Sequence, residues 1–373
     1  MSSLGLYIHV PFCLRKCAYC DFYSGPSSEE ERDAYVAALA GHIKDERQTY
    51  QGRTVDTVFF GGGTPSLLTP LQFSSILDMI QKYASVAPDA EISFEANPAT
   101  LTADSLREYR RAGANRISIG LQSACDGELR LLGRPHTVED FDVIYGDSRR
   151  AGFDNVNVDL MYGIPSQTER SFEKTVKHVL SLAPEHISAY SLILEPGTPL
   201  ARRLDDLDLP DEDATADRYD GLCRALREAG YEHYEISNFA RPGYRCRHNM
   251  KYWQREEYLG FGPSAHSFID NCRFYYPADR ATYLSPATRR VEQEDADTEL
   301  TDAEEAIMLA MRLSDGVDLV RLAAEHGLDF EAKYGTRLAP YLKSGLLRRT
   351  DRGYAFTDRG MFVSNYILSE LFQ

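Results

Sequence analysis

Positive charge is scarce in this chain. Its 373 residues include 41 lysines and arginines against 57 aspartates and glutamates, so the formal net charge is −16. This deficit argues against binding of nucleic acid or anionic lipid through electrostatic attraction, because both bind basic surfaces. No nucleic-acid partner is therefore expected.

Long apolar runs are also missing. No run approaches the roughly 20 apolar residues that a membrane-spanning helix needs, so any membrane contact is expected to be peripheral at most. The first apolar stretch begins at Leu4, which leaves no room for a signal peptide ahead of it. These features together predict a cytoplasmic location.

A disulfide framework is the third absence. The chain has seven cysteines, an odd number, and four of them are scattered: Cys125, Cys223, Cys246 and Cys272. Such usage indicates a reducing compartment. It also provides no second cysteine pair at metal-binding spacing.

The remaining three cysteines form the most informative motif of the chain. Cys13, Cys17 and Cys20 follow the spacing C-x3-C-x2-C. Three thiolates are too few for a structural zinc site, which takes four protein ligands. They can hold three irons of a 4Fe-4S cube and leave the fourth iron open to a small molecule, with S-adenosylmethionine (SAM) as the leading candidate. The alternative interpretations are a structural thiol cluster or half of a zinc site.

Short apolar stretches alternate with longer amphipathic ones over the first 230 residues. Six strands are expected, at residues 4–10, 55–60, 91–96, 116–120, 156–161 and 186–194, each followed by a helix. This alternation predicts βαβ units and a parallel sheet. The expected fold class is therefore α/β, a partial TIM-like (β/α)6 barrel with its site at the carboxyl ends of the strands.

Three parts are expected along the chain. Residues 1–230 would form the barrel, residues 231–290 an irregular aromatic extension, and residues 291–373 a small winged-helix-like α+β domain. The acidic stretch 292–299 is typical of a solvated linker. Beyond it, helices are expected at 301–312, 317–326 and 334–344, followed by a two-stranded wing at 346–356.

Glycines and polar residues gather where the predicted strands end. The run Gly61-Gly62-Gly63-Thr64-Pro65 closes the second strand, and glycine lets the backbone approach a ligand closely. Other candidates follow later strands or flank the cysteines: Glu95, Gln122, Arg134, Asp159, Tyr7 and Tyr19. Each of these could by itself be a structural residue. His9, two residues before Pro11, is expected to orient the cysteine loop by hydrogen bonding.

The cysteine and glycine motifs together resemble those of the radical SAM superfamily. The strand-end residues resemble the coproporphyrinogen III oxidase-like family along nearly the whole chain. The resemblance implies a 4Fe-4S cluster on Cys13, Cys17 and Cys20, and one or two SAM molecules. It implies SAM-binding roles for Tyr7, Tyr19, Gly62, Gly63, Thr64, Glu95, Gln122, Arg134 and Asp159. No catalytic residue is assigned, and an electron donor is needed only if SAM is cleaved.

Two departures separate the chain from the oxidase itself. Phe22 stands where the oxidase carries a fourth cysteine, and only twelve residues precede Cys13. The chain also contains H-N-x-x-Y-W, from His248 to Trp253, the only tryptophan. These features resemble the heme-chaperone subgroup of the same family.

This second resemblance implies that the protein binds heme, with His248 as the leading candidate for the iron ligand. It further implies transfer of heme to respiratory hemoproteins, at the inner face of a membrane. The alternative activity is oxidative decarboxylation of coproporphyrinogen III. A winged-helix regulator that senses redox state through a cluster is disfavoured by the acidic charge.

Overall fold

The computed structural model describes residues 2–289, 291–293 and 301–372. Its contacts divide the chain into two compact units, each made from two stretches. The first unit is Met1–Pro210 with Glu256–Glu294, and the second is Asp211–Arg255 with Asp295–Gln373. Within the described ranges, no helix has the length and apolar character needed to cross a membrane.

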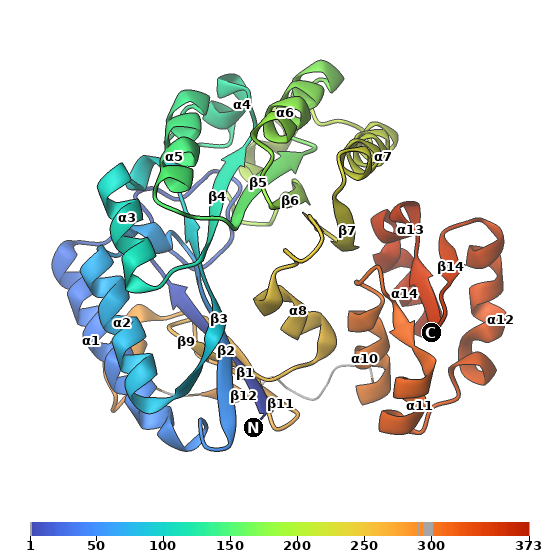
Figure 1. Ribbon diagram of the computed structural model, residues 1–373. Helices are drawn as coiled ribbons and strands as arrows, with labels where there is room; N and C mark the ends of the chain where they lie inside the picture. Colours follow the sequence, from blue (N-terminus) through green and yellow to red (C-terminus); the bar gives the residue numbers. More distant parts are fainter. Residues whose placement is uncertain (1, 290, 294–300, 373) are drawn as a thin grey trace. The chain divides into compact units, whose positions relative to one another are not determined.

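Six parallel strands form the centre of the first unit (Figure 1). They lie side by side in chain order, and every neighbouring pair is parallel. The strands are β1 (Ser2–Val10), β2 (Arg53–Gly62), β3 (Ser85–Ala96), β4 (Arg116–Gln122), β5 (Val156–Tyr162) and β6 (His186–Ser191). The expected α/β class with six successive βα units is confirmed.

Helices connect these strands, and five of them begin at a capping box. The elements are α1 (Glu29–Asp45), η1 (Glu46–Gln48), η2 (Pro65–Leu67), α2 (Pro70–Tyr83), η3 (Pro98–Thr100), α3 (Ala103–Ala112), α4 (Asp126–Leu131), α5 (Val138–Arg150), α6 (Glu169–Leu182) and η4 (Ala201–Asp206). The capping residues are Ser28, Thr69, Thr102, Thr137 and Thr168. Such a cap stabilises a helix by about 0.5–2 kcal/mol, so short-range signals set where these helices start.

The strands of this sheet carry apolar side chains on one face and polar ones on the other. On the apolar face, the rings of Phe60 in β2 and Phe94 in β3 both contact Phe73 of α2. On the polar face, Asn157 of β5 donates to Ser118 of β4 at 2.8 Å. Because buried polar groups need partners, hydrogen bonds between neighbouring strands hold this inner face together.

A short antiparallel extension continues the sheet beyond β1. Strand β9 (Tyr258–Phe261) pairs with β1 in parallel, and β10 (His266–Ile269), β11 (Cys272–Tyr275) and β12 (Glu292–Gln293) follow antiparallel. Helix α9 (Arg280–Leu284) lies between β11 and β12 in sequence. Strands of three or four residues are too short to show a clear period in the sequence, which is why residues 231–290 have an irregular sequence pattern.

The second unit is an α+β assembly that includes residues 211–255. Its elements are α7 (Glu212–Glu228), β7 (Glu232–Glu235), β8 (Asn238–Ala240), α8 (Arg247–Gln254), α10 (Asp302–Ala310), β13 (Val317–Asp318), α11 (Leu319–His326), α12 (Phe330–Lys343), β14 (Leu347–Arg349), β15 (Gly353–Phe356), α13 (Asp358–Phe362) and α14 (Ser364–Phe372). The strands β13, β15 and β14 form an antiparallel sheet, one strand more than the expected two-stranded wing. The acidic stretch 292–299 begins in β12 and otherwise lies outside the described residues.

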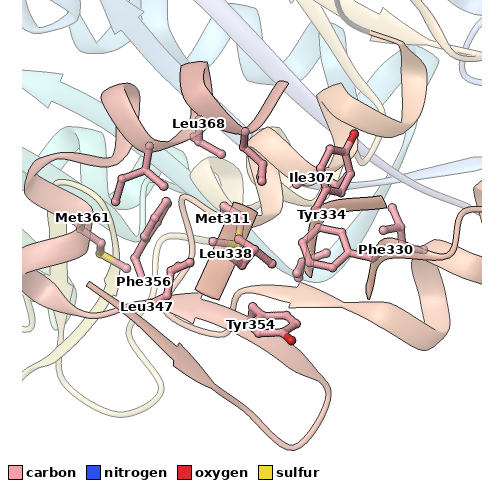
Figure 2. Packing of buried hydrophobic residues seen from close by; sticks show 14 residues of the cluster. Ile307, Met311, Phe330, Tyr334, Leu338, Leu347, Tyr354, Phe356, Met361 and Leu368 are labelled. Atoms are coloured by element: carbon pink, nitrogen blue, oxygen red, sulfur yellow. The ribbon is translucent and has the colours of Figure 1, made fainter. Parts of the chain in front are cut away.

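Figure 2 shows the apolar core of this unit, in which side chains of α10, α12 and α14 meet those of the three-stranded sheet. Tyr334 and Leu338 of α12 are fully buried there. Residues 211–255 join the same unit through polar contacts: the N–H of Ser314 donates to the carbonyl of Tyr234 at 3.0 Å, and Arg255 pairs with Asp302. The second unit is therefore assembled from segments on both sides of residues 256–294.

Candidate functional site

The cysteine loop joins β1 to α1 and is fastened by its backbone. All three of its thiols, those of Cys13, Cys17 and Cys20, are free. The N–H of Cys13 donates to the carbonyl of Gly25 at 2.9 Å, and that of Ala18 donates to the carbonyl of Leu132 at 2.9 Å. The loop therefore has a defined path even though it forms no regular element.

His9 at the end of β1 adds a side-chain contact to this loop. Its Nε2 donates to the carbonyl of Tyr23 at 2.9 Å, which leaves Nδ1 to accept from the hydroxyl of Tyr7 at 3.2 Å. Burial lowers the pKa of His9, so the ring is neutral and can play both roles at once. The prediction that His9 orients the cysteine loop is confirmed.

Gly62 and Gly63 bring the end of β2 into contact with the cysteine loop. A Cβ on Gly63 would lie 2.6 Å from the carbonyl oxygen of Phe12, and one on Gly62 would lie 2.6 Å from the ring of His9. Gly62 also has φ +105°, a value that side-chain-bearing residues rarely adopt. Only glycine at both positions permits this close packing of the end of β2 against His9 and the start of the cysteine loop.

Two side chains donate hydrogen bonds to the thiols. The hydroxyl of Thr64 lies 3.4 Å from the sulfur of Cys13, and Nη1 of Arg134 lies 3.6 Å from the sulfur of Cys17. Nη2 of Arg134 is fixed by the carbonyl of Gly120 at 3.0 Å, whereas its buried Nε finds no hydrogen-bond partner among the described residues. A guanidinium and a hydroxyl stabilise thiolates in preference to thiols.

This donor set fits an iron–sulfur cluster. Three cysteines on one short loop, two of them already hydrogen-bonded at sulfur, match the way clusters are held and tuned. Burial raises the pKa of Cys20, so a bound metal would be needed to hold that thiol as a thiolate. The unpartnered donor on Arg134 also fits a ligand with an acceptor group beside the cysteines.

Two carboxyl groups lie deeper in the barrel. Oε2 of Glu95 accepts from the N–H of Gly62 at 3.2 Å. Burial, reinforced by the negative charge of Asp159, raises the pKa of Glu95 to about 8. Burial also raises the pKa of Asp159, although hydroxyl and amide donors, including Ser118, oppose that rise. The pair thus keeps at least one proton at neutral pH, because two buried charges of the same sign repel each other.

Tyr7, Tyr19 and Gln122 are the remaining predicted SAM-binding residues in the first unit. The buried hydroxyl of Tyr7 lies close enough to Glu95 for that charge to help raise its pKa, after burial itself. Tyr19 packs against the apolar cluster formed by Leu132, Met161 and Ile164. Gln122 has φ +68°, a left-handed conformation that turns the chain at the end of β4.

The structure therefore brings twelve of the thirteen candidates together around the carboxyl ends of β1 to β5. The thirteenth, His248, belongs to the second unit and lies on α8. Its Nε2 is hydrogen-bonded to the hydroxyl of Tyr252 at 2.8 Å, and the two rings are perpendicular. The side chain is buried, with 1% exposure.

Sequence reasoning missed the polar layer beneath this site. The side-chain amide nitrogen of Asn157 donates to Ser118, Ser188 and Asp159 at 2.8, 2.9 and 2.7 Å. Its side-chain oxygen accepts from Nδ1 of His186 at 2.6 Å. This layer fixes the orientation of Asp159. The signal was present as polar residues at alternate positions in apolar strands, Asn157-x-Asp159 and His186-x-Ser188.

Comparisons with known proteins agree with this geometry. The model of the radical SAM superfamily matches residues 7–179, and that of the HemN C-terminal domain matches residues 297–363. The chain is 36% identical to the heme chaperone HemW of Escherichia coli, over 100% of this chain and 98% of that protein. It is 36% identical to the heme chaperone HemW of Mycobacterium tuberculosis, over 99% and 95% of the two chains. The solved structure of the E. coli coproporphyrinogen III oxidase HemN is similar as well, with TM-score 0.84 and 26% identity over 99% of this chain and 90% of that one.

Proposed function

We propose that the protein is a heme chaperone, because the chain belongs to the HemW family of radical SAM proteins. The resemblance to the radical SAM superfamily, and within it to the oxidase-like family and its heme-chaperone subgroup, is confirmed. The observation that carries the proposal is similarity to HemW proteins along the entire chain, from the cysteine loop through α8 to the C-terminal domain. Coproporphyrinogen oxidation has less support, since the curated relatives at 32–36% identity are heme chaperones.

Membership of the superfamily implies a 4Fe-4S cluster and SAM. Cys13, Cys17 and Cys20 would each bind one iron, while Thr64 and Arg134 donate to two of the three sulfurs. When bound and reduced, such a cluster supplies the electron that cleaves SAM in radical SAM enzymes. Hydrogen bonds to the sulfurs disperse their negative charge, so Thr64 and Arg134 would raise the reduction potential of the site.

The remaining mouth residues would position SAM. Gly62 and Gly63 pack the end of β2 closely against the cysteine loop, and their backbone groups would contact a polar group of SAM. Glu95, with its pKa near 8, is protonated at neutral pH and can donate to an oxygen of the ligand. Gln122 and Asp159 offer further polar groups, and the half-buried rings of Tyr7 and Tyr19 would exclude water from the bound SAM.

Heme would be held in the second unit, with His248 as the iron ligand. The hydrogen bond between Nε2 of His248 and Tyr252 occupies one of the two ring nitrogens. For Nε2 to bind iron, its hydrogen bond to the Tyr252 hydroxyl must break. The perpendicular contact between the two rings would then be lost as well. Heme binding by this route is therefore coupled to movement of Tyr252 or of α8.

The bound heme would be passed to hemoproteins, of which respiratory acceptors are the proposed class. Contact with a membrane would be peripheral and brought about by the acceptor, because the chain itself carries a net charge of −16. A cytoplasmic site of action fits this route. An electron donor is part of the scheme only if SAM is cleaved during transfer.

The test is a heme titration of the anaerobically reconstituted protein, followed by absorbance. Wild-type protein should bind heme in a saturable, stoichiometric way, and His248→Ala should weaken binding while its iron–sulfur absorbance is unchanged. Tyr252→Phe is the matched control, because it removes the competing hydrogen bond and keeps the ring. It should bind heme at least as tightly as wild type.

Two results would count against the proposal. Unchanged affinity in His248→Ala would place the heme ligand elsewhere in the chain. Absence of stoichiometric binding by wild type would defeat the chaperone function. A product assay with coproporphyrinogen III would then decide for or against the oxidase.

A further inference from the structure

A second group of metal-ligating side chains lies in the second unit. Cys223 of α7, His233 of β7 and Asp358 of α13 each present one donor atom, and these three atoms all lie within 4.8 Å of one another. Asp358 follows His233 by more than a hundred positions, so no sequence motif joins them. This three-donor cluster shares no residue with the site around the cysteine loop.

Each donor of the cluster is already oriented. Nδ1 of His233 donates to Oδ1 of Asp358 at 3.0 Å, while Oδ2 of Asp358 pairs with Arg227. Nε2 of His233 lies 3.5 Å from the hydroxyl of Tyr219. Tyr219, Cys223 and Arg227 are spaced four residues apart on α7. One face of this helix therefore supplies the ligand Cys223 together with the side chains that contact the other two ligands.

Two of the three donors are shielded from water, whereas the side chain of Asp358 is 24% exposed. Cys223 is only 2% exposed. The ring of His233 stacks on Phe239 with centroids 4.2 Å apart, and Tyr219 packs against Phe362. Packing of this kind locks the side-chain rotamers, which lowers the entropy lost when the donors bind an ion.

We propose that Cys223, His233 and Asp358 form a site for a divalent transition-metal ion, of which zinc is the best match. Thiolate sulfur, imidazole nitrogen and carboxylate oxygen are the three ligand types that zinc takes, and three protein ligands leave a fourth position for water or another small ligand. On binding, Cys223 loses its thiol proton to solvent, and the ring proton of His233 moves from Nδ1 to Nε2, so that the Nδ1 lone pair becomes available to the metal.

The neighbouring residues suit such a site. With one oxygen of Asp358 on the metal, the other keeps its ion pair with Arg227, as a monodentate carboxylate ligand often does. Ligation through Nδ1 of His233 leaves Nε2 to donate to Tyr219. A nucleophilic Cys–His–Asp triad fits less well, because burial raises the pKa of the Cys223 thiol to about 12 and so keeps it protonated and poorly nucleophilic.

Cobalt(II) is the probe of choice, because its absorbance reports thiolate ligation directly. The full chain would be titrated in a background in which Cys13, Cys17 and Cys20 are all changed to alanine, so that the cysteine loop binds no metal. One cobalt per chain should bind and produce a sulfur-to-metal charge-transfer band. Cys223→Ser should abolish the band, and Tyr219→Phe should weaken binding by roughly 10-fold or more.

Cys246→Ser is the matched control, since Cys246 is a buried cysteine of the same unit. It should leave both the band and the stoichiometry intact. The proposal is overturned if no stoichiometric cobalt binds, or if Cys223→Ser keeps the band.

If the triple-alanine chain does not fold, zinc X-ray absorption on wild-type protein with its cluster reconstituted replaces the titration. A first shell of sulfur, nitrogen and oxygen, lost in Cys223→Ser, is then expected, and absence of stoichiometric zinc refutes the site. Neither measurement involves heme or SAM, so its outcome is independent of the chaperone function.

Discussion

Substitution of Gly63 by alanine offers the sharpest test of how the cysteine loop is held. The added Cβ would lie 2.6 Å from the carbonyl oxygen of Phe12, 2.9 Å from that of Val10 and 3.0 Å from the nitrogen of Phe12. All three are backbone atoms, so no side-chain rotation relieves the clash. The loop would have to move by about 0.8 Å to restore ordinary contact, at an expected cost of about 1–3 kcal/mol in stability.

The same movement should reach the cluster site. The N–H of Gly63 donates to the carbonyl of Val10 at 2.9 Å, three residues before Cys13, and Thr64 next to it contacts the sulfur of Cys13. Gly63→Ala should therefore lower the midpoint of urea unfolding. It should also reduce the iron bound per chain after anaerobic reconstitution, measured by absorbance and iron analysis.

Gly41→Ala is the matched control. Gly41 lies in α1 with nothing within 4 Å of its added Cβ, and alanine is favoured over glycine in a helix by about 1 kcal/mol. This variant should be as stable as wild type or more so, with full iron content. Wild-type stability and iron content in Gly63→Ala would refute the argument that glycine is required there.

Three further perturbations test the rest of the site. Cys17→Ala should eliminate the broad iron–sulfur absorbance, whereas Cys125→Ala should keep it; a full cluster in the first variant would refute the ligand assignment. Asn157→Leu should destabilise the fold by about 3 kcal/mol or more in urea unfolding, because His186 and two serines lose buried partners; a loss below about 1 kcal/mol would mean that the polar layer is not required for stability. The pKa of Glu95 is raised from 4.5 to about 8 in the folded state, so between these pH values the folded protein binds a proton that the unfolded chain does not. The free energy of unfolding of wild type should therefore fall as pH rises from about 4.5 to 8. Glu95→Gln should therefore gain stability relative to wild type across that interval, and parallel urea midpoints for the two proteins from pH 5 to pH 8 would contradict the raised pKa.

The sequence was most informative where the determining interactions are local. The spacing of Cys13, Cys17 and Cys20 and the Ser or Thr caps of five helices involve neighbours only a few residues apart. The alternation of strands and helices likewise predicted six parallel strands in chain order. Short-range spacing of this kind is visible in the sequence because it does not depend on how distant segments meet.

The sequence is least informative where elements are short. Residues 231–290 contain strands of three or four residues and the helix α8, which are too short for a repeated apolar pattern to stand out. Its strands are stabilised by pairing, as β9 pairs with β1 from the opposite end of the first unit's sequence. Context of this kind overrides weak local preference.

Taken by itself, the sequence determined the cysteine loop, the glycine turn after β2, the α/β class and the family, because each depends on residue types at fixed short spacing. Only the tertiary structure decided which polar groups share a buried space. It places Asn157 among Ser118, Ser188 and His186, and it sets Cys223 beside His233 and Asp358. Burial and proximity across the chain shift pKa values and create binding sites, and both arise only when strands and helices from distant parts of the sequence pack together.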